Sequence, residues 1–357
     1  MRIKYCIFFL LLFPFSRLFA QIDAPFTFFP WTQPYFNPAT MGEKENHLNF
    51  IGVLSQRTMM RELKDPTDPN SNNDNNNSNN EKNKNKDLYT QQGQQQVLLH
   101  IDSYIKKIKG AAGIMFIKDK FDQIDRVGFG FGYAQKFRVH SGKMSIGAQF
   151  RFINTKPNTT NYIIIQNPDQ TVEEFKGSES FLDFDVNFGI HYKAPNWFVG
   201  ISGTQLIGTT RLSGAEHQSL MSPRQLYLTG GYIWNLKTAV PWTIEPSVLV
   251  HTDFATWHLN VMALARYNGI LYFGLSYQID NGIGVVLGAV PFYNSSNEYL
   301  KGLEIGAGYN FDTKKTAYRQ GGSWGDFEIL IRYGFNFYKD KPLTGYGSTR
   351  HLYKNQY

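Results

Sequence analysis

The chain has 357 residues, a formal net charge of +7 and one cysteine, Cys6, which lies near the N-terminus. The rest of the chain therefore excludes a disulfide framework, a thiol metal site and a lipid-modified cysteine. No later segment reaches the roughly 18 consecutive apolar residues of a membrane-spanning helix. We expect no nucleic-acid partner, because the sequence has no basic stripe with interleaved aromatic residues.

Residues 1–20 have the three parts of a secretory signal. Arg2 and Lys4 form a basic start, an apolar run covers residues 5–15, and the small Ala20 ends the segment. The run is shorter than the roughly 20 apolar residues of a membrane helix, so we expect it to direct export and then be removed. Removal deletes three basic residues and no acidic residue, which lowers the formal charge to +4.

Residues 21–42 form an N-terminal segment rich in proline and aromatic residues. The prolines are Pro25, Pro30, Pro34 and Pro38, and the aromatic residues are Phe26, Phe28, Phe29, Trp31, Tyr35 and Phe36. Prolines at this spacing oppose a regular helix or a central strand, and the aromatic residues are too apolar to remain in water. We expect either a plug in the periplasmic mouth of a barrel or a contact, through Phe28 and Trp31, with a periplasmic partner.

Strict alternation of apolar and polar residues predicts long amphipathic strands in the remainder. Apolar residues occupy every second position from Leu182 to Tyr192 and from Leu271 to Ile279. Together with 29 Phe, 21 Tyr and 32 Gly, this pattern predicts an all-β, antiparallel transmembrane barrel over residues 43–338. We expect fourteen strands, near 47–57, 97–105, 109–117, 125–138, 142–155, 182–193, 196–206, 225–237, 242–253, 256–266, 270–280, 283–292, 299–312 and 325–338.

Loop length predicts the orientation of this barrel. The longest connections, 58–96, 156–181, 207–224 and 313–324, all follow odd-numbered strands, whereas most connections after even-numbered strands are tight. Outer-membrane barrels have short periplasmic turns and long extracellular loops, so both termini are expected in the periplasm. The Asn-rich stretch 65–86 is expected to be a disordered extracellular loop, and residues 339–357 a basic periplasmic tail.

The predicted inner face of the barrel carries charges of both signs. They include Lys136, Arg151, Asp183, Asp185, Arg266, Glu304, Glu328 and Arg332. Mixed signs favour mutual pairing in a filled lumen over the single-sign ring of an ion-selective pore. Gly128, Gly130 and Gly132 share this inner face, as do Gly306 and Gly308, and they would leave room for a plug.

No catalytic, cofactor or metal site emerges from the residues. Asp183 and Asp185 share a strand face and could bind a hard cation, but further oxygen ligands at a recognisable spacing are missing. His140 and Ser141 are adjacent on a turn, where their side chains point apart and cannot form a nucleophile and its base. We therefore expect a protein that is not an enzyme and needs no cofactor.

Two motifs in the N-terminal segment carry a family resemblance. An aromatic-rich stretch over residues 26–36 is followed by Asn37-Pro38-Ala39-Thr40-Met41-Gly42, an Asn-Pro-Ala-x-x-Gly pattern. Later blocks, such as Tyr227 to Tyr232, Glu245 to Val250 and Gly308 to Asp312, follow in the order of the same family. The chain resembles the PorP/SprF outer-membrane proteins of Bacteroidota, and Asn37, Pro38, Ala39 and Gly42 are the residues that match the family motif.

The resemblance implies a place in the type IX secretion system. It implies a barrel of the cell outer membrane that supports secretion or surface attachment of cargo proteins, contacts periplasmic components of the machine and, in some species, serves gliding motility. The alternative is a plugged channel for a small solute, which also suits fourteen strands and an N-terminal plug.

Overall fold

The fold is that of a computed structural model, which we describe for most of the chain. The described residues are 26–43, 47–62, 89–121, 124–157, 180–207, 210–213, 223–236, 240–279, 282–295, 297, 300–311 and 325–336. The expected signal peptide, the Asn-rich stretch 65–86 and the tail 339–357 lie outside them. No helix among the described residues is long and apolar enough to cross a membrane.

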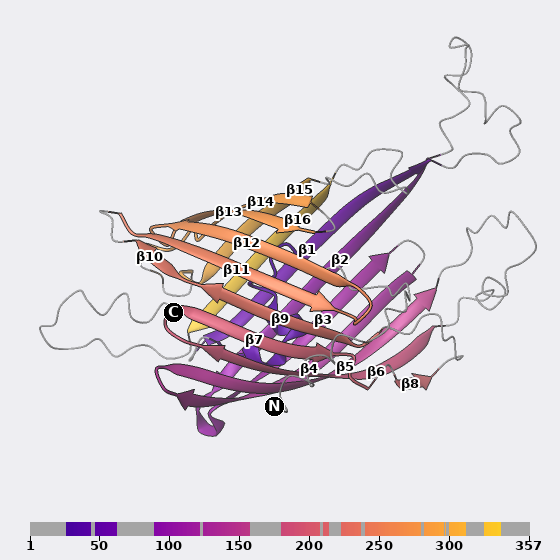
Figure 1. Ribbon diagram of the computed structural model, residues 1–357, viewed down its shortest axis with the longest axis horizontal. Coiled ribbons are helices and arrows are strands. Elements are labelled where there is room, and N and C mark those ends of the chain that lie inside the picture. Colours follow the sequence, from indigo (N-terminus) through magenta and orange to yellow (C-terminus); the bar gives the residue numbers. More distant parts are fainter. Residues whose placement is uncertain are drawn as a thin grey trace, which may run out of the picture.

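The described strands form one antiparallel sheet that closes on itself (Figure 1). Strand β1 pairs with both β2 and β16, and β11 pairs with both β12 and β9, so the sheet is a closed barrel. The strands are β1 (His47–Glu62), β2 (Tyr89–Ile105), β3 (Gly110–Phe121), β4 (Ile124–Val139), β5 (Gly142–Pro157), β6 (Phe181–Lys193), β7 (Trp197–Thr204), β8 (Thr210–Ser213), β9 (Gln225–Tyr232), β10 (Trp234–Leu236), β11 (Trp242–Thr252), β12 (Trp257–Tyr267), β13 (Leu271–Gln278), β14 (Gly282–Ala289), β15 (Leu303–Phe311) and β16 (Asp326–Asn336).

Two of these sixteen described elements are continuations, so the barrel has fourteen strands. Strand β10 continues β9 after a break at Ile233, and both pair with β11. Strand β8 follows β7 and pairs with β6 beyond the end of β7. The predicted all-β fold and strand number are confirmed.

Several predicted strand ends were wrong. Strands β1 and β2 pair from Leu48 and Ser103 as far as Glu62 and Tyr89, well beyond the predicted ends at residues 57 and 97. The Gln-rich start of β2 has no apolar alternation, yet its backbone groups still pair with β1, so the hydrophobic pattern could not reveal it. At the other extreme, the predicted strand 299–312 begins only at Leu303.

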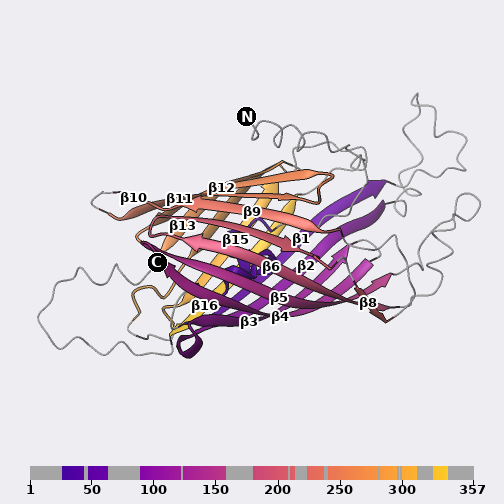
Figure 2. The ribbon, with the colours of Figure 1, turned by 60° about the horizontal axis from the view of Figure 1, so that its bottom comes forward.

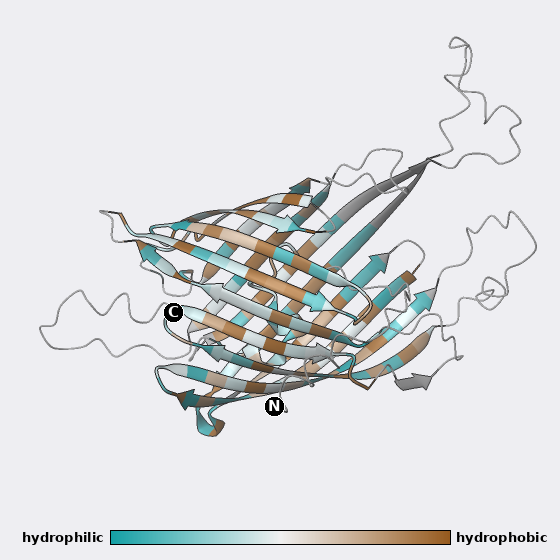
Figure 3. Ribbon diagram, viewed as in Figure 1, coloured by the Kyte–Doolittle hydropathy of each residue, from teal (hydrophilic) through white to brown (hydrophobic). Residues whose placement is uncertain are grey.

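The two faces of the strands alternate as the sequence predicts. Along β13, residues Leu271, Phe273, Leu275 and Tyr277 are exposed on the outside, and the residues between them are buried on the inside. Figure 3 shows the corresponding bands of hydrophobic and hydrophilic residues along neighbouring strands. An outer face of this kind suits contact with lipid rather than with water.

The two ends of the barrel differ in their connections. At one end, short segments such as 106–109, 140–141 and 268–270 join the strands, and we call it the short-turn end (Figure 1, left). At the other end the strands enter the long connections 63–88, 158–180, 214–224 and 312–325, and we call it the long-loop end. The long connections thus share one end, as predicted from their positions after odd-numbered strands.

The outer face generates a first prediction about stability in the membrane. Leu275 is 60% exposed near the middle of β13. The substitution Leu275→Lys should lower the free energy of unfolding by about 2–4 kcal/mol, because a charge at mid-membrane depth loses its hydration. Urea unfolding of the barrel refolded into lipid vesicles measures the change. Leu275→Ala is the control for lost side-chain volume, and equal effects of the two variants would contradict a lipid-facing position.

Candidate functional site

The N-terminal segment Phe26–Gly42 lies inside the barrel and fills part of its lumen. In Figures 1 and 2 this indigo segment is enclosed by the ring of strands. It contains a short helix, α2 (Gln33–Phe36), and a 3-10 turn, η1 (Pro38–Thr40), each with a proline near its start, where the missing N–H costs no hydrogen bond. All residues of the segment except Pro30 and Gln33 are buried. We call residues 26–42 the plug.

The aromatic residues of the plug pack against one another and against the barrel wall. The Phe26 ring meets Tyr35 edge-on at 5.9 Å between centroids, and Phe28 meets Trp31 at 5.5 Å. Phe36 stacks on Tyr227 of β9 at 5.1 Å. Burial of such a side chain contributes about 1.5–3 kcal/mol, so the apolar plug is stable only inside the lumen.

A buried carboxylate of the wall, Glu328 in β16, binds the first half of the plug. It accepts hydrogen bonds from the Thr27 backbone N–H at 2.8 Å, from the Thr27 hydroxyl at 2.9 Å and from the Phe28 N–H at 3.2 Å. The Thr27 hydroxyl also accepts a bond from Asn310 of β15. Three hydrogen bonds from two neighbouring residues of the plug converge on this one side chain, so these contacts fix the position of Thr27.

A second buried carboxylate, Glu304 in β15, is the centre of an ion network that reaches the plug. It accepts a bond from the Trp31 indole N–H at 3.2 Å. Arg266 and Arg332 bind its two oxygens at 3.1 Å and 3.2 Å. The Arg266 guanidinium also lies over the Tyr272 ring, 4.8 Å from its centroid. The charges of this part of the wall are thus paired with one another and with Trp31, as a filled lumen requires.

The family-motif residue Asn37 joins the plug to the opposite wall. Its side-chain oxygen accepts the Ala39 N–H at 3.0 Å and so caps η1, while its amide nitrogen donates to the Ile190 carbonyl of β6. A Cβ on Gly189 would lie only 2.1 Å from the Asn37 oxygen. The absence of a side chain at Gly189 therefore makes the space in which Asn37 fits.

The rest of the motif fits the wall in the same way. Pro38 and Ala39 lie against Gly147 of β5, where a Cβ would come within 2.5 Å of the Ala39 nitrogen. Gly42 has φ +62, which favours glycine, and a Cβ there would meet Ala111 at 2.3 Å. The Gly42 N–H donates to Asp102 of β2 at 2.7 Å. The motif residues therefore fit closely against the wall, in space that small wall residues leave open.

The eight predicted lumen charges all lie on the inner face. Arg151, Asp183, Asp185, Glu304 and Glu328 are buried, whereas Lys136, Arg266 and Arg332 are half-buried. Arg151 is the register partner of Asp185 and lies over the plug ring Tyr35, 5.1 Å from its centroid. The sequence did not indicate which plug residues these charges would meet, because the partners are far apart along the chain.

The lumen glycines contact the plug only in part. Gly306 and Gly308 face the Phe28 ring, and Gly132 faces Met41. Gly128 and Gly130 instead face wall residues, Ile117 and Arg151. The plug rests on other glycines, Gly147 and Gly189, which the sequence did not single out.

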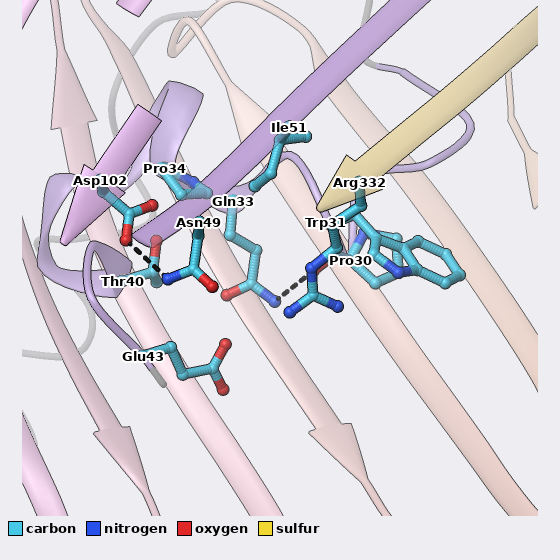
Figure 4. Close-up of a pocket in the computed structure, with 10 residues that line it drawn as sticks. All are labelled: Pro30, Trp31, Gln33, Pro34, Thr40, Glu43, Asn49, Ile51, Asp102 and Arg332. Atoms are coloured by element: carbon cyan, nitrogen blue, oxygen red, sulfur yellow. Dashed lines mark hydrogen bonds between the residues drawn. The ribbon is translucent and has the colours of Figure 1, made fainter. Parts of the chain in front are cut away.

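A small polar cavity remains between the plug and the wall, near the short-turn end (Figure 4). Its volume is about 60 Å³, large enough for several waters. It is lined by Pro30, Trp31, Gln33, Pro34, Thr40 and Glu43, and on the wall by Asn49, Ile51, Asp102 and Arg332. Among the described residues, no three His, Cys, Asp or Glu side chains are placed to hold a metal ion.

These features define a class of protein: an outer-membrane β-barrel whose lumen is occupied by its own N-terminal segment. The family model of the type IX secretion system membrane protein PorP/SprF matches residues 18–333. The chain belongs to this family, which makes it an outer-membrane component of type IX secretion, in contact with the membrane and with secretion components. No curated protein sequence matches it.

Solved structures share the fold at low identity. The TodX ΔS2S3 mutant, a monoaromatic hydrocarbon channel, is 9% identical with a TM-score of 0.52, over 84% of this chain and 93% of that chain. The Ralstonia pickettii toluene transporter TbuX is 13% identical with a TM-score of 0.45, over 91% of this chain and 98% of that chain. The first of these supports the barrel fold alone.

The Glu328 contact generates a prediction about stability. Thr27→Val keeps the shape of the side chain but removes the hydroxyl that Glu328 and Asn310 bind, so it should lower the free energy of unfolding by about 2 kcal/mol. Thr243→Val, which removes an exposed hydroxyl bonded to Asn235, should cost about 0.5 kcal/mol or less. Urea unfolding of both variants tests this, and equal losses would contradict the anchoring role.

The fit of Asn37 generates a prediction about the position of the plug. Gly189→Ala places a methyl group on the Asn37 side chain and should displace the plug, whereas Gly230→Ala meets its nearest neighbour only at 3.7 Å and should be neutral. Protease accessibility of the plug in the folded barrel is the measurement. An unchanged digestion pattern in Gly189→Ala would show that Asn37 does not fix the plug.

Proposed function

We propose that this protein acts in type IX secretion as a closed scaffold that supports export or surface attachment of cargo proteins through protein contacts. The observation that carries the proposal is the occupied lumen. Glu304 and Glu328 bind Trp31, Thr27 and Phe28 of the plug, so the interior groups that could select a solute are used to hold the chain itself. In this role the protein is not an enzyme and needs no cofactor.

The long-loop end is the part of the barrel that we assign to cargo. Its connections are the longest in the chain, and long loops of outer-membrane barrels face outward. The short-turn end, with both ends of the barrel chain nearby, is assigned to periplasmic components of the machine. A role in gliding motility, in a species that glides, belongs to the same proposal.

The second candidate function is a channel for a small solute. The cavity beside the plug favours it, because it leaves polar space between the plug and the wall, lined by Glu43, Asn49 and Asp102. The structural likeness to a hydrocarbon channel adds only the shared fold. Passage would require the Trp31 contact with Glu304 and the two arginines to open.

Deletion of residues 26–36 distinguishes a closed scaffold from a channel. The deletion removes the aromatic half of the plug but keeps the motif from Asn37 onward. The purified wild-type barrel should show no steady conductance in a planar bilayer, and the deletion variant should conduct. Steady conductance or solute uptake by the wild type would favour the channel.

Gene deletion in the native organism tests the role in secretion. Loss of one or a few surface proteins, with outer-membrane permeability unchanged, is the expected result. Complementation with Gly189→Ala and with Gly230→Ala shows whether a seated plug is needed for export. An unchanged set of surface proteins together with reduced uptake of a solute would overturn the scaffold proposal.

A further inference from the structure

The rim of the short-turn end is positively charged on one side. Exposed Lys106, Lys107 and Lys109 form the turn between β2 and β3, and Arg138 is exposed at the end of β4. The described rim from β7 to β12 instead exposes aromatic residues such as Trp197, Trp234 and Tyr267. The rim is thus polarised around the barrel axis.

Three further lysines of this side belong to the mouth of the lumen. Lys136, Lys143 and Lys193 lie at the ends of β4, β5 and β6, on the inward-facing positions of these strands. Lys143 and Lys193 are register partners on β5 and β6, and Lys136 is within electrostatic range of both, so the three form one cluster. We call it the mouth cluster.

An acidic residue of the N-terminal segment lies at the mouth cluster. Glu43 directly follows the plug residue Gly42 and forms an ion pair with Lys193. Lys136 lies within electrostatic range of Glu43 and of Asp102 in β2. The Glu43 side chain is 43% exposed and the Lys193 side chain 26% exposed, so this ion pair is accessible from the mouth.

We propose that the mouth cluster is a docking site for an acidic protein segment, whose carboxylates replace Glu43 as the ion-pair partner of Lys193. The proposal rests on the proposed function and names the chemistry of one partner at the short-turn end. An accessible ion pair is worth little in water, so a segment with several carboxylates can displace a single one. Displacement of Glu43 acts on the chain directly after the plug, which couples docking to the plug.

A protein segment fits this cluster better than anionic lipid does. Lipid headgroups surround the outside of a barrel, whereas Lys136, Lys143 and Lys193 occupy inward positions around the mouth. Their inward direction matches that of Gly147 and Gly189, which hold the plug. A chain that enters the mouth can reach all three lysines, but a headgroup at the outer wall cannot.

A binding experiment with a labelled peptide tests the proposal on the full-length, refolded barrel. The probe is a synthetic peptide of about twelve alternating Asp and Glu residues, and the matched Asn and Gln peptide is its control. Lys136→Gln/Lys143→Gln/Lys193→Gln should weaken binding of the acidic peptide about tenfold. Lys106→Gln/Lys107→Gln/Lys109→Gln removes the same charge from the outer turn and should weaken it less than about threefold.

Glu43→Gln supplies a test with the opposite sign. Removal of the competing carboxylate should tighten acidic-peptide binding about threefold, whereas Asp125→Asn at the long-loop end should leave it unchanged. This single substitution also keeps the proposal testable if the triple mouth variant does not fold. Equal weakening by the two triple variants, or no effect of Glu43→Gln, would overturn the proposal.

A competition experiment with vesicles tests whether the mouth cluster binds anionic lipid instead of an acidic protein segment. Under the proposal, phosphatidylglycerol vesicles should not displace the peptide from the wild-type barrel. Displacement that is lost in the triple mouth variant would show that the partner is anionic lipid and would overturn the proposal of a protein partner. The peptide measurements do not depend on secretion in cells. Failure of peptide binding therefore leaves the scaffold proposal to its own tests, and failure of the secretion test leaves the peptide result intact.

Discussion

The hydrogen bonds from Thr27 and Phe28 to Glu328 are the interaction on which the closed barrel depends most. A carboxylate in the buried lumen is costly unless donors surround it, and the wall alone gives Glu328 few donors. The plug supplies two backbone N–H groups and a hydroxyl at 2.8–3.2 Å. The wall in turn satisfies the backbone N–H groups of Thr27 and Phe28, which precede the hydrogen-bonded turns of the plug. Each part thereby removes an unsatisfied polar group of the other.

The shape of the wall fits the plug as closely as its hydrogen bonds do. The plug needs small wall residues wherever it approaches a strand closely, and Gly147, Gly189 and Gly306 provide them. Where the wall carries large residues, the plug presents rings that stack on them, as Phe36 does on Tyr227. Interiors packed in this way respond to a change of a single methyl group, so the plug has one position rather than a range of positions. A position fixed in this way suits a structural core.

Sequence patterns reveal the barrel far better than its interior. Alternation along β6 and β13 determines which side of each strand faces lipid, because a side chain must point to one face or the other. The plug was also predictable as a segment, since its prolines and aromatic residues leave it no stable place outside. The wall residues that the plug contacts were not predictable. Glu328 and Thr27 are 301 positions apart, and no period in the sequence joins them. In the sequence, Gly147 and Gly189 do not differ from other strand glycines, and only the fold brings Ala39 against Gly147 and Asn37 against Gly189.

The filled lumen also determines where this protein can communicate with others. The wall charges Arg266, Glu304 and Arg332 are committed to one another and to Trp31, so the interior has no free charge pattern here for a passing partner. Recognition is then left to the two rims, which carry different chemistry. At the short-turn rim, Glu43 is both part of the N-terminal chain and accessible from outside. Glu43 directly follows Gly42, the last residue of the plug. A ligand that moves Glu43 therefore also acts on Gly42, whose N–H donates a hydrogen bond to Asp102. The short-turn rim and the plug are therefore directly connected through the chain, although most residues of the plug are buried.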